Sequence, residues 1–428
     1  MRRVLPFLAA LACAAQAPEV EALAKAVDAK VLAWRRDFHA HPELGNREVR
    51  TAAQVAEHLR ALGLEVRTGV AQTGVVALLK GAKPGPRLAL RADMDALPVT
   101  EQVDLPFASK ATGEYRGEKV GVMHACGHDA HTAILMGVAE ALVARKAQLA
   151  GEVLFLFQPA EEGAPEGETG GAERMLREGL FRDRKPDAVM GLHVMAGLPV
   201  GQVGYRSGAL LAAVDDFRVV VKGRQTHGAK PWGGIDPIVA AAGIVTSAQS
   251  IVSRRMDLTA QPAVLTFGSF RGGLRSNIIP DEVELLGTLR TFDPVQRKTL
   301  IAELTRVVEH GAAAHGATAT LQVPFTHNYP PTVNDAALTA RVVPSLRRAA
   351  GEAAVREVPA ITGAEDFAFY AQEVPGFFYF VGATPAGQDP ATAASNHSPR
   401  FFLDEGALKV GVRTLLQASL DFLAPGRR

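Results

Sequence analysis

The stretch from His124 to His131 contains residue types that suit metal binding. It reads His-Ala-Cys-Gly-His-Asp-Ala-His, so that Cys126 and His128 lie two positions apart with the flexible Gly127 between them. A thiolate and an imidazole held this close can bind one soft or borderline divalent metal ion. Alone the pair is a weak signal, because short Cys/His pairs occur by chance and a lone cysteine usually acts as a small buried hydrophobic residue.

Further acidic and histidine side chains follow apolar runs of the sequence or lie near its end. They are Asp93 with Asp95, Glu161 with Glu162, His193, and His397. Taken singly, each has a simpler interpretation: a glutamate pair is usually solvated surface, the aspartates can cap a turn, and a lone histidine is more often a core or turn residue. Their coincidence at the ends of predicted strands favours one shared site and indicates a metal-dependent hydrolase.

The number of candidate ligands bears on the number of metal ions. The candidates are Cys126, His128, Glu162, His193 and His397. A catalytic zinc ion usually takes three protein ligands and a water, so five ligands exceed one tetrahedral ion. Two ions that share a bridging ligand fit better, and such a pair makes hydroxide available near neutral pH. A carboxylate outside the ligand set must carry the proton, and Glu161 stands beside Glu162 for this role.

Beneath these residues the sequence predicts an α/β sheet. Near-continuous apolar strands alternate with helical patterns, which indicates a sheet covered by helices on both faces. The candidate side chains follow the ends of these strands, and in open α/β sheets sites form at the carboxyl ends of strands. The expected strands are residues 74–80, 87–91, 152–157, 188–193 and 377–382, and the expected helices are residues 20–39, 48–62, one capped by Asp129, and 404–423.

The character of the sequence changes between residues 213 and 323. Strand-like and helical patterns there follow the order β-α-β-β-α-β, which is that of a ferredoxin-like unit. We predict that this unit is inserted, because His397 after it must rejoin the candidate ligands before it. The expected domains are a signal peptide at 1–17, a metal-bearing α/β catalytic domain formed by 18–212 and 326–428, and a lid at 213–325.

Length and composition limit the class of protein and its partners. A chain of 428 residues is long enough for two domains, and its net charge of +1 gives no indication of a nucleic-acid partner. Two cysteines cannot form a disulfide framework. No apolar run beyond the N-terminus is long enough to span a bilayer, so we expect no membrane span.

The N-terminus is predicted to be a processing signal. Met1-Arg2-Arg3 is basic, residues 4–15 are apolar, and Ala15-Gln16-Ala17 has the small-x-small pattern of a cleavage site, although Pro18 is awkward for a signal peptidase. We therefore expect export to the periplasm or the exterior. Two alternatives stay open: lipid anchoring at Cys13, as the minor one, and a frayed apolar N-terminus that is not a signal.

In combination, the motifs of this chain resemble the M20 metallopeptidase family. The branch that it resembles most contains amidohydrolases of N-acyl amino acids, such as hippurate hydrolase, aminoacylase-like enzymes and auxin-conjugate hydrolases. The motifs occur in order over nearly the whole chain after residue 17, at residues 91–98, 124–131, 158–162, 193–195 and 363–367. The resemblance implies an α/β domain with an inserted lid that often dimerises, Glu161 as general base, and the metal ligands Cys126, His128, Glu162, His193 and His397.

The resemblance also implies roles for residues of the lid. Thr226-His227-Gly228-Ala229 resembles a motif whose histidine stabilises a developing oxyanion, often in the active site of the partner subunit. Here Gln225 and Thr226 replace the usual glycine pair. The segments around Asn277 and Arg290 resemble those that hold the substrate carboxylate, and arginine suits bidentate pairing. Without the resemblance, Arg290 is equally well explained by a surface salt bridge, and His227 by a loop histidine.

These observations predict a metal-dependent amidohydrolase that cleaves N-acyl amino acids with activated water and Glu161 as base. We expect two divalent ions per subunit, zinc or manganese, with cobalt or nickel as alternatives. The expected partners are the small acyl amino acid or peptide substrate and a second copy of the chain. An exported dipeptidase or carboxypeptidase of the same family is the alternative, and a non-catalytic peptide-binding protein is a third hypothesis, against which Glu161 argues.

Overall fold

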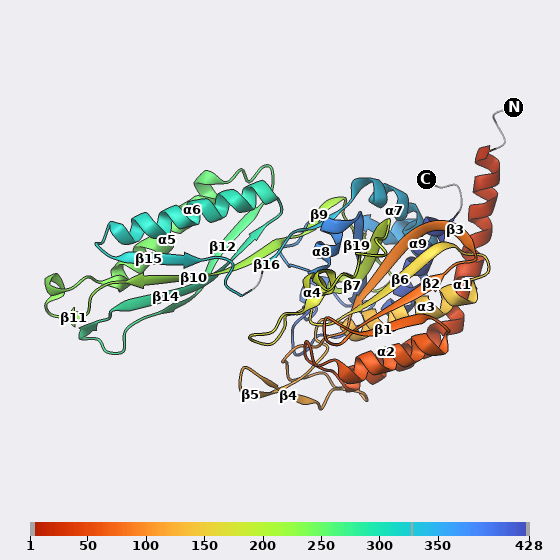
Figure 1. Ribbon diagram of the computed structural model, residues 1–428, viewed down its shortest axis with the longest axis horizontal. Coiled ribbons are helices and arrows are strands. Elements are labelled where there is room, and N and C mark those ends of the chain that lie inside the picture. Colours follow the sequence, from red (N-terminus) through yellow and green to blue (C-terminus); the bar gives the residue numbers. More distant parts are fainter. Residues whose placement is uncertain (1–4, 327, 425–428) are drawn as a thin grey trace. The chain divides into compact units, whose positions relative to one another are not determined.

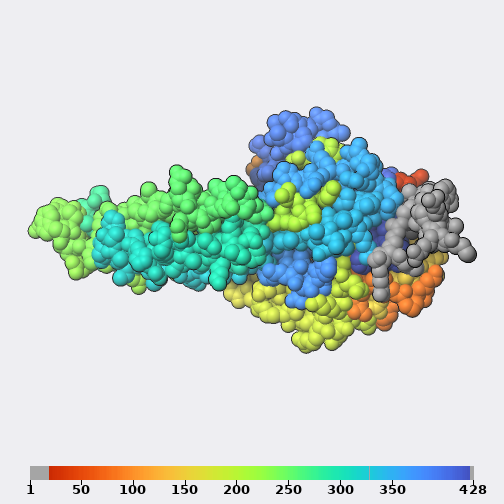
Figure 2. Space-filling model, turned by 90° about the horizontal axis from the view of Figure 1, so that it is seen from above, coloured from red at the N-terminus to blue at the C-terminus, as the bar shows by residue number. Residues whose placement is uncertain are grey.

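The computed structural model describes residues 5–326 and 328–424 (Figure 1). The chain forms two units. Unit 1 comprises Met1–Gly208, Val333–Pro359 and Phe369–Arg428, and unit 2 comprises Ala209–Thr332 and Ala360–Ala368. In the space-filling view, the Ala209–Thr332 part of unit 2 is coloured green to cyan, whereas unit 1 combines colours from both ends of the sequence (Figure 2).

Unit 1 is built on an eight-stranded mixed sheet. Its order is β1-β2-β6-β3-β7-β19-β8-β18, and the four central strands β6, β3, β7 and β19 are mutually parallel. The bounds are β1 Glu65–Val70, β2 Gly74–Lys80, β3 Lys83–Asp93, β6 Ala150–Gln158, β7 Ala188–Pro199, β8 Val203–Tyr205, β18 Val355–Glu357 and β19 Gly376–Thr384. Strands β6 and β19 are almost wholly buried, as continuous apolar runs require.

The helices of unit 1 pack against this sheet and against one another. They are α1 Leu5–Ala40, α2 Val49–Ala61, α3 His128–Ala144, α4 Gly171–Arg177, α7 Ala336–Ala350, α8 Phe367–Glu373 and α9 Gly406–Leu423. Helix α3 is buried on nearly every side and contacts both α1 and α9. Small residues permit this close approach, since a Cβ at Gly137 would lie 2.5 Å from Val31 and one at Gly411 2.5 Å from Ile134.

Helix α1 begins well before the residue at which the sequence pattern placed it. The helix was expected from residue 20, but it extends from Leu5 to Ala40 without interruption at residue 17. The apolar stretch that the sequence analysis assigned to a signal peptide is therefore helical from Leu5 onward and continuous with α1. Among the described residues, no helix combines enough length and apolarity to cross a membrane.

Unit 2 has the predicted ferredoxin-like topology. Its strands run in the order β12-β14-β10-β15, all neighbours are antiparallel, and β16 pairs with β10. The elements are β10 Ala213–Lys222, α5 Pro237–Arg255, β12 Ala263–Arg271, β14 Glu282–Thr291, α6 Pro294–Ala313, β15 Thr318–Gln322 and β16 Asn328–Tyr329. Asp236 and Asp293 cap α5 and α6, and each helix starts with proline. The fold-class prediction is thus confirmed.

Short elements complete the chain. They are β4 Thr112–Tyr115, β5 Glu118–Gly121, β9 Gly208–Leu211, β11 Thr226–His227, β13 Ile278–Ile279, β17 Thr332–Asn334 and the 3-10 turns at Pro231–Gly233, Glu352–Ala354 and Pro390–Thr392. Each unit has its own hydrophobic core. In unit 2 this core includes Phe217, Ile244 and Leu285, all inaccessible to solvent.

Candidate metal centre

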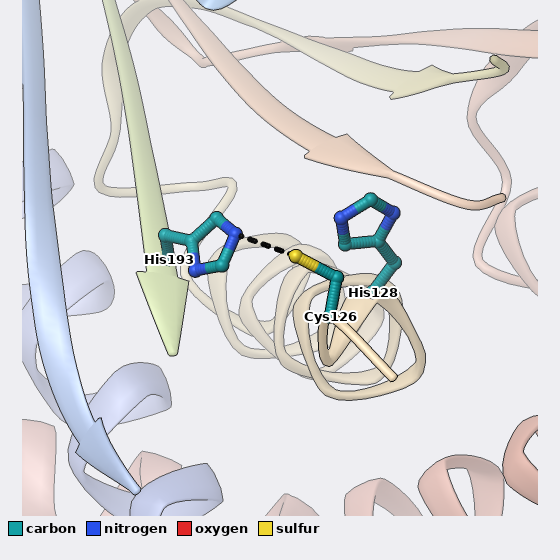
Figure 3. A group of neighbouring side chains, drawn as sticks. All are labelled: Cys126, His128 and His193. Carbon is teal, nitrogen blue, oxygen red and sulfur yellow. Dashed lines mark hydrogen bonds between the residues drawn. The ribbon is translucent and has the colours of Figure 1, made fainter. Parts of the chain in front are cut away.

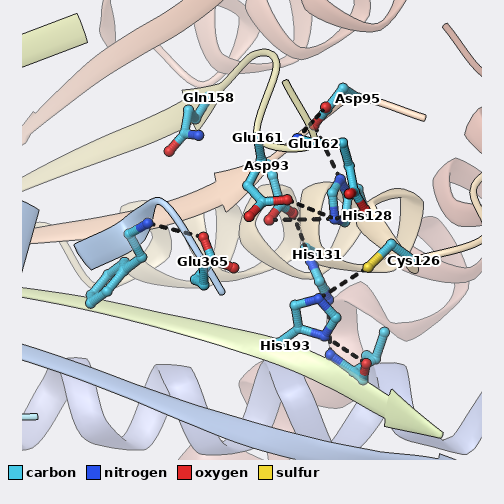
Figure 4. Close-up of polar contacts among 12 residues, drawn as sticks. Asp93, Asp95, Cys126, His128, His131, Gln158, Glu161, Glu162, His193 and Glu365 are labelled. Atoms are coloured by element: carbon cyan, nitrogen blue, oxygen red, sulfur yellow. Dashed lines mark hydrogen bonds and ion pairs between the residues drawn. The ribbon is translucent and has the colours of Figure 1, made fainter. Parts of the chain in front are cut away.

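The predicted ligands of unit 1 meet at the carboxyl ends of its central strands (Figure 4). Asp93 is the last residue of β3, and the segment that carries Glu161 and Glu162 follows the end of β6. His193 lies in β7, the neighbour of β3. Because β6, β3 and β7 are parallel, their ends bring these side chains to one edge of the sheet.

A glycine turn aims Cys126 and His128 at this edge. Gly127 has a φ of 95°, in the left-handed region, and it immediately precedes the first turn of α3. A Cβ at this position would lie 2.2 Å from a methyl carbon of Val194, so a larger residue is excluded by both backbone conformation and space. The expectation that Asp129 caps the helix is wrong, because the helix begins one residue earlier, at His128.

Cys126 lies at the centre of the cluster (Figure 3). Its Sγ is 3.3 Å from Nε2 of His193 and 3.2 Å from Nε2 of His397. The same nitrogen of His397 lies 2.9 Å from a carboxylate oxygen of Glu162. Two groups of potential donor atoms, each within 4.8 Å of one another, therefore share this sulfur: Cys126 with His128 and His193, and Cys126 with Glu162 and His397.

His128 presents one nitrogen to the centre and uses the other for support. Its Nδ1 lies 3.2 Å from Oδ1 of Asp95, whose other oxygen accepts a hydrogen bond from the backbone N–H of Glu162. Its Nε2 has no hydrogen-bond partner among the described residues, although oxygens of Asp93 and Glu161 lie 3.7 and 3.9 Å away. A buried donor atom at these distances from carboxylates fits a position beside a metal ion.

The tautomer of His193 follows from its hydrogen bonds. Its Nδ1 lies 2.7 Å from the carbonyl oxygen of Val194, which can only accept, so Nδ1 carries the proton and Nε2 offers a lone pair. The N–H of Val194 donates to Nε2 of His131, whose Nδ1 in turn bonds Asp93 at 2.6 Å. Arg91 forms a buried ion pair with the same aspartate. This chain of contacts fixes the middle of β7, around His193 and Val194.

His397 is held by contacts of its own segment. It has a φ of 72°, and its backbone N–H donates to the carbonyl of Ala125 at 2.8 Å. The side chain of Asn396 donates to the carbonyls of Cys126 and Val194, both at 3.1 Å, and accepts from the N–H of Ala196. The C-terminal segment is thereby tied to both the glycine turn and β7.

Sequence reasoning missed Asn396 and gave His131 no place among the ligands. A weak signal existed for each, since Asn396 is adjacent to a candidate ligand and His131 follows His128 by three positions on one helix. Their partners are backbone groups distant in sequence, and only the fold reveals them.

The electrostatics of the cluster favour a bound cation. Burial raises the pKa of the Cys126 thiol well above its usual value, and the charges of Glu162 and Glu161 raise it further. Burial alone would lower the pKa of His128, but Asp93 and Asp95 raise it to about 10. Both shifts show a buried site that is rich in negative charge, and a divalent ion with thiolate, imidazole and carboxylate ligands fits it.

The predicted substrate residues lie in unit 2. His227 in β11 pairs with Ile278 in β13, and the N–H of Gly228 donates to the carbonyl of Asn277 at 2.8 Å, so His227 and Asn277 are neighbours. The N–H of Ala229 donates to Nδ1 of His227 at 3.0 Å, which leaves the proton of the neutral imidazole on Nε2.

Arg290 lies elsewhere in the same unit, near the far end of β14, opposite Val214 of β10. Its side chain is partly buried, and burial lowers its pKa against the opposing effect of Asp216 and Asp215. Its Nη1 is buried and has no hydrogen-bond partner within the described part of the chain. The structure therefore places the three predicted substrate residues at two separate positions of unit 2.

Comparison with known proteins finds relatives that are similar to this chain over most of its length. Residues 89–421 match peptidase family M20/M25/M40. An N-acetylcysteine deacetylase of Bacillus subtilis is 39% identical and is matched over 90% of this chain and 95% of its own. Thermostable carboxypeptidase 1 of Saccharolobus solfataricus is also 39% identical, over 89% and 92%. The crystal structure of the Bacillus subtilis YXEP protein, described as a dinuclear metal-binding peptidase, superposes with a TM-score of 0.76 at 36% identity, covering 93% of this chain and 99% of that one.

The prediction of export, with lipid anchoring at Cys13 as its variant, is wrong. It depended on an apolar leader that ends at residue 17, whereas α1 continues through this position to Ala40. The matched deacetylase and carboxypeptidase, which resemble this chain over most of its length, give no indication of export either. The first turns of a helix and the apolar core of a leader can have the same apolar composition, and this is why the pattern misled.

The family resemblance stated from the motifs is confirmed. The matched relatives are named for the removal of an acyl group and for the cleavage of a peptide bond, which are both hydrolyses of an amide. The hypothesis of a non-catalytic binding protein is left without support. From the matched residues, the relatives and the cluster of metal-ligating side chains, the chain belongs to the M20/M25/M40 peptidase family and is a metal-binding hydrolase of amide or peptide bonds.

Proposed function

We propose that this protein hydrolyses the amide bond of N-acyl amino acids of the hippurate type and holds two divalent metal ions per subunit. The observation that carries the proposal is the position of the Cys126 sulfur, which belongs to two different groups of potential metal donors. One ion would bind Cys126, His128 and His193, and the other Cys126, Glu162 and His397. Zinc or manganese suits this mixed set, with cobalt or nickel as alternatives.

When bound, the two ions would make a nucleophilic water available near neutral pH and polarise the scissile carbonyl. Glu161 is the proposed general base. Its side chain is buried in the same cluster, with Oε2 3.9 Å from Nε2 of His128, and it belongs to neither of the two groups of donors that contain Cys126. In this position Glu161 removes a proton from the attacking water and delivers it to the leaving nitrogen.

We propose that residues of unit 2 complete the site. The Nε2–H of His227 would donate to the oxyanion that develops on the carbonyl oxygen, with Asn277 beside it. Arg290 would bind the substrate carboxylate with two hydrogen bonds. Arg290 lies eight positions after Glu282 along β14. This distance is about 26 Å at the rise of a strand.

This separation supports a shared active site. One acyl amino acid is too short to reach His227 and Arg290 of the same chain, because β13 and β11 lie beside the start of β14 and Arg290 near its end. We therefore propose a homodimer in which each active site takes its oxyanion-binding histidine from one chain and its carboxylate-binding arginine from the other.

The acyl amino acid is favoured over the peptide by the name of one relative, N-acetylcysteine deacetylase, whose substrate is an acylated amino acid. A carboxypeptidase is the second candidate, because another relative is a thermostable carboxypeptidase. Recognition of a terminal carboxylate by Arg290 suits both substrates. They differ in what lies on the other side of the scissile amide, which is an acyl group in one case and an aminoacyl residue in the other.

A comparison of substrates tests this choice. Purified, metal-loaded enzyme is expected to hydrolyse hippurate and N-acetyl amino acids with a kcat/KM at least about tenfold above that of unblocked dipeptides, which carry a charged ammonium group beside the amide. Steady-state hydrolysis of both series at equal metal content measures it. A preference for unblocked dipeptides or for long peptides would assign the enzyme to the second class.

Metal binding is expected to release a proton from Cys126. The pKa of this thiol is raised in the metal-free site, so it is protonated at neutral pH and must lose its proton to bind metal. Protons compete with metal more strongly at low pH, and apparent affinity therefore rises with pH. Zinc titration by calorimetry in buffers of different ionisation enthalpy measures the release, which should fall by about one proton in Cys126→Ser. Equal proton release from both proteins would exclude the thiolate ligand.

Glu161→Gln is expected to lower kcat by roughly 10²- to 10⁴-fold, because glutamine cannot accept the proton of the attacking water. Metal content by mass spectrometry should equal that of the wild type, since Glu161 lies outside the proposed ligand set. The exposed Glu166, in the same loop, provides the matched control Glu166→Gln, which should retain activity. Wild-type turnover by Glu161→Gln contradicts the mechanism.

Mixed dimers test the shared site. Glu161→Gln and His227→Ala, each nearly inactive alone, are co-expressed with different tags so that half the dimers contain one subunit of each. Each mixed dimer then has one site with both residues intact, and the mixture should regain about a quarter of wild-type activity. If His227 serves the site of its own chain, no intact site forms and the activity stays at the level of the single variants.

A further inference from the structure

The segment that carries Glu161 has a backbone conformation that needs support. Ala160, the residue immediately before it, has a φ of 51°, in the left-handed region that residues with a Cβ seldom adopt. On the other side of Glu161, the backbone N–H of Glu162 donates a hydrogen bond to the carboxylate of Asp95 at 2.9 Å. Glu162 is thus fixed by Asp95, and the direction of the Glu161 side chain also depends on the contacts that hold Ala160.

Ala160 is held by a buried carboxyl group from a distant segment. Glu48, the residue before α2, is inaccessible to solvent, and its Oε1 accepts a hydrogen bond from the N–H of Ala160 at 2.8 Å. Its Oε2 accepts from the hydroxyl of Thr73 at 2.5 Å. Both oxygens thus have a partner, and only one of the two partners belongs to the segment that carries Glu161.

The surrounding backbone is packed too closely for this segment to relax. A Cβ at Gly45 would lie 2.6 Å from the carbonyl oxygen of Gly163, and one at Gly170 would lie 2.7 Å from Cβ of Ala160. The side chain of Asn46, which is also buried, donates to a carboxylate oxygen of Glu168 at 2.9 Å and to the carbonyl of Thr169 at 3.2 Å. Residues 45–48 therefore pack tightly against residues 160–170 and are hydrogen-bonded to them.

The charge state of Glu48 suits a role in holding backbone rather than in binding a cation. Burial, followed by the charge of Asp95, raises the pKa of Glu48 to about 8. Near neutral pH the side chain is then largely an uncharged acid. An uncharged glutamine of the same length can replace it, since its carbonyl oxygen can accept from Ala160 and its amide can donate to the hydroxyl of Thr73.

We propose that Glu48 is a positioning residue for catalysis, which holds Ala160 in its left-handed conformation so that Glu161 faces the reacting water. This inference rests on the proposed role of Glu161 as the general base. Glu48 lies outside the metal cluster and acts on the reaction only through the backbone of residue 160. The partner that matters is the N–H of Ala160, while the bond with Thr73 contributes to stability alone.

The test compares three substitutions in the full-length, metal-loaded enzyme. Glu48→Ala removes both hydrogen bonds, Glu48→Gln keeps both, and Thr73→Val removes only the one that does not reach Ala160. Each protein is examined for kcat, KM, metal content, melting temperature and hydrogen exchange of a peptide spanning residues 158–163. Glu48→Asp, whose carboxyl is one methylene farther from Ala160, replaces the alanine variant if that variant does not fold.

Glu48→Ala is expected to lower kcat by about 10- to 100-fold, because a small displacement of a catalytic group has effects of this size. KM and metal content should stay near wild type, and exchange in residues 158–163 should become faster. Glu48→Gln should restore kcat to within about threefold of wild type, the range of a retained hydrogen-bond geometry. Thr73→Val should lower the melting temperature while kcat per folded molecule and exchange at 158–163 stay unchanged.

Two results would overturn the proposal. If Glu48→Ala and Thr73→Val lower the melting temperature alike and leave kcat per folded molecule unchanged, Glu48 is merely structural. If exchange in residues 158–163 is the same in Glu48→Ala and wild type, the carboxyl does not hold this segment. Failure of the proposed function is recognised separately, because Glu161→Gln would then be active whatever Glu48 does to the exchange of residue 160.

Discussion

The burial of several carboxylates at the candidate metal centre is the constraint on which the rest of this structure depends. Glu161 and Glu162 stand with a cysteine and three carboxyl-bonded or backbone-bonded histidines at one edge of a sheet, where Arg91 forms a buried ion pair with Asp93. Such a group is unstable without cations, since the desolvation of several carboxylates is costly. The elements that surround it, from the glycine turn before α3 to the loop of His397, hold donor atoms in place for ions that complete the charge balance.

Much of the fold followed from local patterns. Strands β2, β3, β6, β7 and β19 were predicted because each is a short apolar run bounded by polar or turn residues. Glu162 and His193 were predicted as ligands because they follow such runs, and Cys126 and His128 because of their spacing. The inserted unit was predicted from the order of its periodicities. Gly127 could be assigned from sequence because a single residue decides whether the turn can form.

Other features depend on contacts that no local pattern encodes. Asn396 bonds backbone groups of Cys126 and Val194 far along the chain, and Glu48 bonds Ala160 across more than a hundred residues. Their sequence surroundings resemble an ordinary turn and an ordinary helix start. The prediction for the N-terminus failed for a different reason. Hydrophobic composition alone does not distinguish a leader from the first turns of a long helix, and α1 continues through the expected cleavage position.

The position of His397 has a consequence for the order in which the protein is made. The group of Cys126, His128 and His193 is complete once residue 193 has been synthesised, whereas the group of Cys126, Glu162 and His397 waits for His397, after the inserted unit. A chain that stops before His397 retains the first set of donors and lacks the second. In the proposed two-ion site, the second group is therefore complete only when the polypeptide has been made as far as His397.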